Sequence, residues 1–293
     1  MLKGARALAV PLKFGQTLNV AHTKESYGQL RWNASVNDEF WFEVIFDIES
    51  LEIIETSDII KTKYLAAILK QANIQNPKIL KNTKGLFVKT NANFDINWGL
   101  GSSSTLIVNV AKWFEIDPYE LLFKTSSGSG YDVACANTDS PIFYQLSSKH
   151  PEVEKIIFNP DFKQNLYFVY LGKKQQSHQS IKHFSGNLQD RKTEIQRISE
   201  ISGELTSTHD LEEFEFFIDE HEKIMAGILE IPTIKETTFA DYKGSVKSLG
   251  AWGGDFVMMT WREDLGKLKQ YLNTKGLNVV FPFDEIVLNR KSS

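Results

Sequence analysis

The chain has 293 residues, a formal net charge of −4 and a hydrophobic fraction of 42%. These values predict a globular protein with one large or two medium domains. Because 33 basic and 37 acidic residues are mixed along the chain, no basic stripe points to nucleic acid or to an anionic membrane surface.

The cysteine content and the length of the apolar runs indicate in which cellular compartment the protein is expected. The single cysteine, Cys135, excludes an intramolecular disulfide framework and a multi-cysteine zinc site, and its apolar neighbours favour a buried, inert thiol. No apolar run approaches the roughly 20 residues that span a bilayer, and the opening residues lack the pattern of a secretory signal. We therefore expect a soluble, cytoplasmic protein.

The first half of the chain predicts strands followed by helices. Residues 8–46 alternate apolar and polar side chains around a polar turn at 35–38, which favours antiparallel strands. Residues 59–69 carry a helical apolar stripe that opens at a Ser57 or Asp58 cap. After a strand at 85–94, residues 106–114 predict a helix that ends before Asp117 and Pro118.

The second half predicts a further domain. Residues 151–163 are polar and contain proline, and residues 165–172 then resemble a fresh buried strand, so we place a domain boundary near 161. Helices are expected over 188–205 and 210–229, and strands over 256–261 and 277–283. The coarse prediction is an α+β chain with domains at 1–161 and 162–293.

The stretch NWGLGSSSTL places glycines and serines directly before the helix at 106–114. Free backbone N–H groups and the positive end of a helix dipole favour an anion there, and serine hydroxyls can donate to phosphate or ligate magnesium. A flexible connector or a serine-capped helix start are the alternatives. Neither a Walker loop nor a dinucleotide fingerprint is present.

Two further glycine-rich elements follow. In SSGSGYDVACA, a tight turn at Gly128 and Gly130 can present Asp132 either to accept a proton from an attacking hydroxyl or to cap a helix. In KSLGAWGGDFVMMT, the glycines lead straight into a strand, and a bulged hairpin is the plain alternative to a functional loop.

In this order and spacing, GLGSSS, SGSGYD and GAWGGD resemble the three motifs of the GHMP kinases, most of all the mevalonate and phosphomevalonate kinases. The resemblance implies a two-domain fold with an N-terminal ribosomal-protein-S5-like domain and a C-terminal ferredoxin-like α/β sandwich. It also implies transfer of the ATP γ-phosphoryl group, with Mg²⁺, to a hydroxyl or phosphate acceptor. The expected acceptor is mevalonate or phosphomevalonate in isoprenoid precursor synthesis.

Site residues follow from the resemblance position by position. Asp132 would orient or deprotonate the acceptor, and Ser103 would face the magnesium ion, with Glu120 as a second ligand or simply a solvated helix residue. Trp98 would pack under the loop or stack near the adenine. The nucleotide would be held by Gly99, Leu100, Gly101, Ser102, Ser103, Ser104, Gly250, Ala251, Gly253 and Gly254.

Substrate contacts are implied at Gly130, Tyr131, Ser177, Ser180 and Lys13, the last three with a surface position as the alternative. In the family, a strand with a lysine precedes the run that opens this sequence, so that strand is expected to be missing from 1–161. Trp252 replaces a family glycine. A catalytically impaired nucleotide- or metabolite-binding homologue and a sugar or homoserine kinase remain alternatives, and we expect a monomer or homodimer.

Overall fold

The structure is a computed structural model that describes residues 4–25, 27–148, 150–172, 191–250, 252 and 254–288. It divides into two compact units, each described here by itself. Unit 1 comprises Met1–Lys13, Asn97–Gly99 and Thr138–Ser293. Unit 2 comprises Phe14–Ile96 and Leu100–Asn137.

Unit 2 is built on a five-stranded sheet in the order β2-β6-β3-β4-β5. β3 pairs with β4 in an antiparallel register, as the alternating pattern predicts, and β6 lies between β2 and β3, antiparallel to one and parallel to the other. The strands are β2 (Gln16–His22), β3 (Gln29–Val36), β4 (Glu39–Asp47), β5 (Ile53–Thr56) and β6 (Leu86–Ala92).

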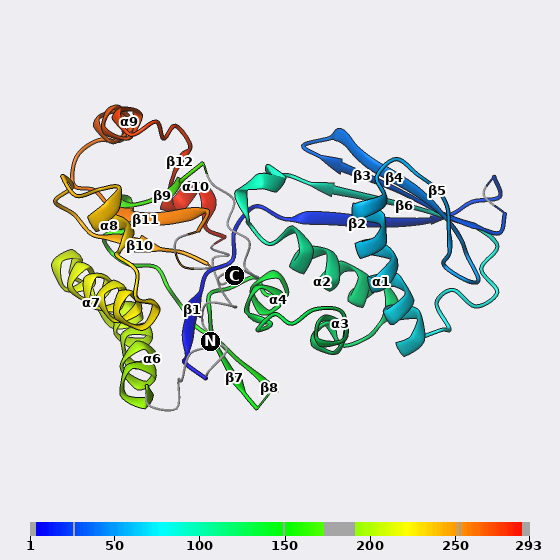
Figure 1. Ribbon diagram of the computed structural model, residues 1–293, viewed down its shortest axis with the longest axis horizontal. Coiled ribbons are helices and arrows are strands. Elements are labelled where there is room, and N and C mark those ends of the chain that lie inside the picture. Colours follow the sequence, from blue (N-terminus) through cyan, green and yellow to red (C-terminus); the bar gives the residue numbers. More distant parts are fainter. Residues whose placement is uncertain are drawn as a thin grey trace. The chain divides into compact units, whose positions relative to one another are not determined.

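Helices cover one face of this sheet, as Figure 1 shows for α1 and α2. The apolar sides of strands and helices form one core, in which Trp32, Phe46, Ile68, Val110 and Phe114 are almost fully buried. The helical segments are α1 (Ile59–Gln75), the single turn η1 (Ile96–Trp98), α2 (Ser102–Phe114), α3 (Pro118–Thr125) and α4 (Tyr131–Ala136); η1 spans the point where unit 2 gives way to unit 1.

Unit 1 contains a four-stranded antiparallel sheet in the order β10-β11-β9-β12. Among the described residues, its elements follow as strand, helices, two strands, helix and strand, which is the ferredoxin-like pattern that the resemblance implies. These elements are β9 (Leu166–Tyr170), α6 (Lys192–Ser207), α7 (Leu211–Leu229), α8 (Ile234–Thr237), β10 (Val246–Ser248), β11 (Phe256–Thr260), α9 (Leu265–Thr274) and β12 (Val280–Pro282).

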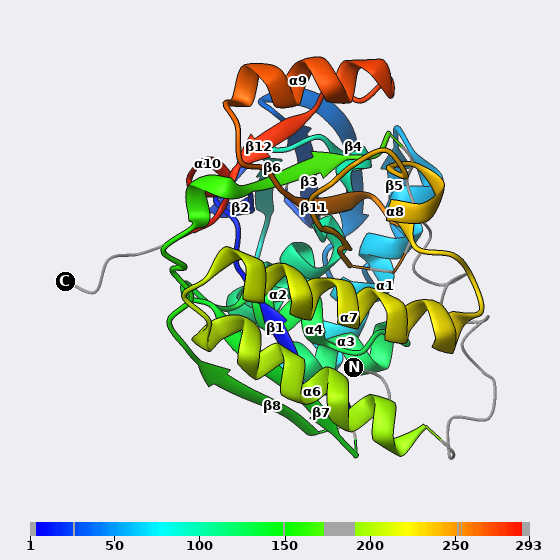
Figure 2. The ribbon, with the colours of Figure 1, turned by 90° about the vertical axis from the view of Figure 1, so that its left-hand side faces the viewer.

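Two helices of unit 1 run side by side, as Figure 2 shows for α6 and α7. A bidentate pair joins them, because Arg197 on α6 donates to both carboxylate oxygens of Glu220 on α7 at 2.7 Å. α7 in turn contacts β10, so it lies against the sheet that carries the third glycine-rich motif. The remaining elements are η2 (Lys163–Asn165) and α10 (Phe283–Ile286).

The observed units divide the chain at other points than the predicted boundary near 161. Thr138–Ser293 belongs to unit 1 as a whole, together with the first 13 residues. The reason is a three-stranded sheet in which β1 (Ala7–Ala9) pairs with β7 (Ile142–Ser147), which pairs with β8 (His150–Lys155). Contacts between distant segments, rather than a composition shift along the chain, therefore set the units.

Helix termini agree with the sequence in some places and differ in others. Asp58, not Ser57, caps α1 by accepting from the N–H groups of Ile60 and Lys61. α2 begins at Ser102, four residues before the predicted run, and ends at Phe114 beside Glu115 in a left-handed conformation. Asp117 therefore caps α3 instead of ending α2. No helix in the described part of the chain is long and apolar enough to cross a membrane.

Candidate phosphate loop and acidic site

The first glycine-rich motif lies at the start of α2. Gly99 and Gly101 have φ angles of +68° and +82°, which only glycine adopts readily. Gly101 precedes the first helical residue, and its carbonyl accepts from the Thr105 N–H at 2.9 Å. Gly101 has no side chain to cap the helix, and the first turn carries no acidic residue. The N-terminus of α2 is therefore suited to an anion.

Side chains hold this helix start on the sheet of unit 2. The Thr105 hydroxyl lies within hydrogen-bond distance of the Ser102 carbonyl and of Gln16 Oε1, at 3.0 and 3.1 Å. Asn109 donates to the Gln16 carbonyl at 2.8 Å. The first turns of α2 are thus held against β2.

Ser103, the predicted magnesium-facing serine, lies in the first turn of α2. Its side chain is hydrogen-bonded to Tyr64 of α1. Partial burial raises the pKa of Tyr64, and the bond to Ser103 opposes that rise. The tyrosine therefore stays protonated at neutral pH and orients the serine hydroxyl.

The residues just before the loop pack within unit 1. Trp98 contacts the rings of Tyr170 on β9, Phe256 on β11 and Phe281 on β12, with centroids 5.3 to 6.5 Å apart. The Tyr170 hydroxyl also donates to the Asn97 carbonyl at 3.1 Å. Trp98 therefore packs on aromatic side chains of β9, β11 and β12, and stacking near the adenine stays a prediction.

Gly99 has a further steric role that sequence reasoning missed. A Cβ atom built on Gly99 would lie 2.0 Å from Oδ2 of Asp255, the aspartate that ends the third motif. The two motifs are more than 150 residues apart in the sequence, so only the spatial pairing reveals this contact. The signal in the sequence was the GGD tripeptide before β11.

Asp132 lies in the first turn of α4; the residue is accessible to solvent, although the surrounding protein displaces part of the water around its carboxyl. The cap position is held by Gly130, with φ +83°, and no side chain caps this helix, so the capping role considered for Asp132 is not observed. Loss of solvation raises the pKa of the Asp132 carboxyl. A carboxylate that is accessible and more basic than usual can accept a proton.

Neighbours of Asp132 respond to its charge. Burial, together with the charge of Asp132, raises the pKa of the Cys135 thiol to about 12, so this thiol is protonated at neutral pH. Burial also raises the pKa of Tyr131. Tyr131, expected to contact substrate, is thus a neutral hydroxyl beside the carboxylate.

The third motif connects β10 to β11, so the hairpin considered from the sequence is present. Gly250 has a φ of +63°, Gly254 is buried, and the Leu249 N–H donates to the Phe256 carbonyl at 3.1 Å across the base of the hairpin. Ala251 and Gly253 lie outside the described residues. The indole N–H of Trp252 donates to Glu222 on α7 at 3.2 Å.

The remaining predicted residues have varied surroundings. The Lys13 ammonium donates to the Asp284 carbonyl at 2.6 Å. Glu120 is exposed in the first turn of α3, on a different helix from Ser103. Ser177 and Ser180 lie outside the described residues. Among the side chains that the structure describes, no group of three His, Cys, Asp or Glu is arranged to hold a metal ion.

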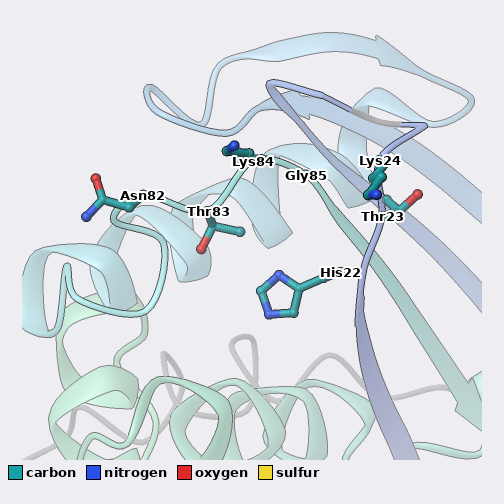
Figure 3. Close-up of a pocket in the computed structure, with 7 residues that line it drawn as sticks. All are labelled: His22, Thr23, Lys24, Asn82, Thr83, Lys84 and Gly85. Atoms are coloured by element: carbon teal, nitrogen blue, oxygen red, sulfur yellow. The ribbon is translucent and has the colours of Figure 1, made fainter.

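A pocket of about 400 Å³ lies elsewhere in unit 2, between the end of β2 and the segment before β6 (Figure 3). None of the predicted site residues lines it. No acidic side chain lines it either, and its residues are His22, Thr23, Lys24, Asn82, Thr83, Lys84 and Gly85.

Comparisons with known proteins agree on the fold. The chain has the fold of the GHMP kinases. It is similar to the mevalonate kinase of Methanococcus jannaschii, with a TM-score of 0.70 and 16% identity, over 99% of this chain and 93% of that one. No protein-family model and no curated protein matches the sequence.

Two other solved structures widen the comparison. Phosphomevalonate kinase of Streptococcus pneumoniae, in complex with phosphomevalonate and AMPPNP, is similar with a TM-score of 0.64 and 13% identity over 95% of this chain and 98% of that one. Galactokinase of Lactococcus lactis, complexed with galactose, has a TM-score of 0.60 and 10% identity over 98% of this chain and 88% of that one. Identities this low establish the fold alone.

Proposed function

We propose that this chain is an ATP-dependent kinase that phosphorylates a small molecule. The observation that carries the proposal is the start of α2, where two glycines with positive φ angles precede a helix without a side-chain cap or an acid in its first turn. A nucleotide phosphate would satisfy both the N–H groups and the dipole of this helix. The GHMP kinase fold over almost the whole chain supports it.

Each motif has a role in the proposed reaction. ATP, when bound, supplies the phosphoryl group. Gly101, Ser102 and Ser104 would bind its phosphates through backbone and hydroxyl donors, and Asp132 would accept the proton of the attacking hydroxyl. Gly99 and the glycines of the third motif are further candidate contacts of the nucleotide. Protein groups of this kind act by position and charge rather than by covalent chemistry.

Magnesium would accompany the nucleotide, since phosphoryl transfer requires its charge to be neutralised. Ser103 is oriented by Tyr64 and can offer a hydroxyl oxygen, whereas Glu120 is solvated on α3. The described residues provide no preformed set of carboxylate ligands. Mg²⁺ would therefore be held largely by phosphate oxygens and water.

We propose mevalonate or phosphomevalonate as the acceptor, with Gly130, Tyr131, Ser177, Ser180 and Lys13 as candidate contacts. Support comes from the GSGYD motif and from the similarity to solved mevalonate and phosphomevalonate kinases. A sugar kinase is the second candidate, because a galactokinase shares the fold at nearly the same coverage. The third candidate is a homologue that binds nucleotide without turnover, which the bulky Trp252 in a glycine-rich loop favours.

A panel assay tests these candidates. ADP release from MgATP is followed by coupled assay with mevalonate, phosphomevalonate, homoserine and galactose in turn, and ATP binding is measured in parallel by calorimetry. Acceptor-dependent ADP release with mevalonate or phosphomevalonate supports the proposal, and release with galactose alone assigns a sugar kinase. A chain that binds ATP but releases no ADP with any acceptor contradicts the enzyme proposal.

A further inference from the structure

Glu222 is a buried carboxylate that none of the glycine motifs includes. It lies on α7 and is only 3% exposed. Its Oε1 atom accepts from Lys247 Nζ at 3.1 Å and from Trp252 Nε1 at 3.2 Å, and its Oε2 atom accepts from the Ser248 N–H at 3.1 Å. All of these residues belong to unit 1.

The electrostatics of this cluster keep Glu222 charged. Burial by itself would raise its pKa, but the Lys247 ammonium, the neighbouring His221 ring and the Ser248 N–H together lower the pKa to about 2. His221 Nδ1 lies 3.0 Å from Lys247 Nζ and 3.5 Å from Glu222 Oε1. A buried carboxylate in this state must keep its donors, since an unpaired buried charge is costly.

The donors come from the hairpin that carries the third motif. Lys247 and Ser248 belong to β10, immediately before the glycine-rich connection, and Trp252 lies within that connection. One carboxylate on the helix behind the sheet thus contacts both the strand and the loop. A glycine at position 252 could not make the indole contact.

We propose that Glu222 is a positioning residue that holds the glycine-rich loop between β10 and β11 through Trp252, and thereby sets the affinity for the nucleotide phosphates. The claim about nucleotide affinity rests on the proposed function, whereas the claim that Glu222 holds the loop does not. Trp252 then contributes an anchor where the resembling kinases have a glycine, and Glu222, which lies behind the loop, touches neither nucleotide nor acceptor.

Trp252→Phe is the sharper variant, because it keeps an aromatic side chain, smaller than the indole, and removes the N–H donor. Trp261→Phe is its matched control, since Trp261 lies in the same unit and its Nε1 donates to the Asp264 carbonyl at 3.0 Å, away from the loop. We expect the dissociation constant for ATP, measured by calorimetry, to rise about tenfold in Trp252→Phe and to stay within about twofold in Trp261→Phe.

Glu222→Gln tests the carboxylate itself. Its control is Glu215→Gln on the same helix, where the carboxylate pairs with Arg262 at 2.7 and 2.8 Å on the far side of the hairpin from the loop. With ¹⁵N-labelled tryptophan, the indole signal of Trp252 is identified by its loss in Trp252→Phe. We expect that signal to shift and exchange faster with water in Glu222→Gln, and to stay unchanged in Glu215→Gln.

A third measurement, hydrogen exchange, needs no nucleotide. The Leu249 amide closes the hairpin on the Phe256 carbonyl, so its hydrogen exchange reports the order of the loop. We expect faster exchange in Trp252→Phe and Glu222→Gln and no change in the controls.

The outcomes separate the inference from the proposed function. An unchanged Trp252 indole signal in Glu222→Gln, or unchanged Leu249 exchange in both loop variants, overturns the inference, as does an ATP affinity that stays within twofold in Trp252→Phe. A wild-type chain that binds no ATP contradicts the proposed function and, with it, the claim that Glu222 sets nucleotide affinity. The indole signal and the Leu249 exchange would still decide whether Glu222 positions the loop.

Discussion

At the scale of single residues, the conformation of Gly99 links two motifs. Its φ angle of +68° favours glycine, and the Asp255 carboxylate occupies the space where a Cβ atom would stand. Local sequence explains the first requirement, since glycine-rich turns adopt such angles. The second arises only because Asp255, the residue directly before β11, lies beside the chain at Gly99.

Gly99→Ala should therefore destabilise the protein. The positive φ angle costs about 1–3 kcal/mol for a non-glycine residue, and the new methyl group would displace Asp255. Gly15→Ala is the control, because nothing lies within 4 Å of the Cβ position there. Urea denaturation measures both, and a Gly99→Ala variant as stable as Gly15→Ala would show that Asp255 moves aside at little cost.

Asp132→Asn should remove most turnover while ATP affinity stays nearly intact. The amide cannot accept the proton of the acceptor hydroxyl, so we expect kcat to fall by about 10²–10⁴. Asp139→Asn, which removes the charge of a carboxylate paired with Lys155, should leave kcat unchanged. Activity of Asp132→Asn within a few-fold of wild type would exclude the role of general base.

The pH profile follows from the same carboxyl. Because loss of solvation raises the pKa of Asp132 above its ordinary value of 3.8, the acid limb of kcat/KM should lie above that value. The active form is the carboxylate, so activity falls as the pH decreases through the raised pKa. The limb should disappear in Asp132→Asn.

Among the elements, α2 is notable for its start, where a glycine in the left-handed conformation holds the cap position and no side chain caps the helix. In unit 2, the cap residues of α1 and α3 are aspartates that accept from N–H groups of the first turn, whereas the cap residue of α2 is Gly101, which has no side chain. The free end of α2 is consistent with a site that an external anion completes.

Ser102→Asp should place a permanent charge where phosphate is expected. The helix gains about 0.3–1 kcal/mol from the interaction of the carboxylate with its dipole, while the KM for ATP rises about tenfold or more through repulsion. Ile60→Asp adds the same charge to the first turn of α1, at a side chain 81% exposed, and should leave KM unchanged. Equal effects on KM would mean that general charge, not this helix terminus, governs binding.

Several elements are predictable from the sequence because their causes are local. The apolar stripe and the Asp58 cap define α1, and the alternating run at 39–46 defines β4. The start of α2 was placed four residues late, because Ser102–Thr105 carry no apolar stripe and only the Gly101 conformation reveals the beginning of the helix.

At the scale of the whole molecule, the buried cluster around His221 couples stability to pH. Burial and the neighbouring Lys247 lower the pKa of His221 from 6.5 to about 4. The unfolded chain therefore binds a proton between these values that the folded chain does not bind. The contribution of His221 to the free energy of unfolding is fully present above pH 6.5. It is lost as the pH drops from 6.5 toward 4, and the loss is at most about 3 kcal/mol.

His221→Gln should remove this part of the pH dependence, because glutamine does not titrate and its oxygen can still accept from Lys247. Free energies of unfolding measured between pH 7 and 4 should vary less in His221→Gln than in wild type. His209→Gln is the control, since His209 is 83% exposed and pairs only with Asp161 among the contacts found for it. Identical pH dependence in all three proteins would mean that His221 titrates normally.

Several local features of this protein are predictable from neighbouring residues alone. Glycine spacing, helix caps and apolar periodicity are sufficient to predict a glycine-rich loop at a helix start and a turn at Gly130 just before Asp132, because neighbouring residues cause them. The candidate roles of these residues stay predictions.

Contacts between distant segments, in contrast, are visible only in the folded chain. The pairing of β1 with β7 moves the first residues into unit 1, Asp255 lies against Gly99, and Glu222 accepts from Trp252. The physical reason is that strand register and buried charge pairs depend on packing across the fold, and residues far apart in the chain carry no local sign of the partner that they will contact.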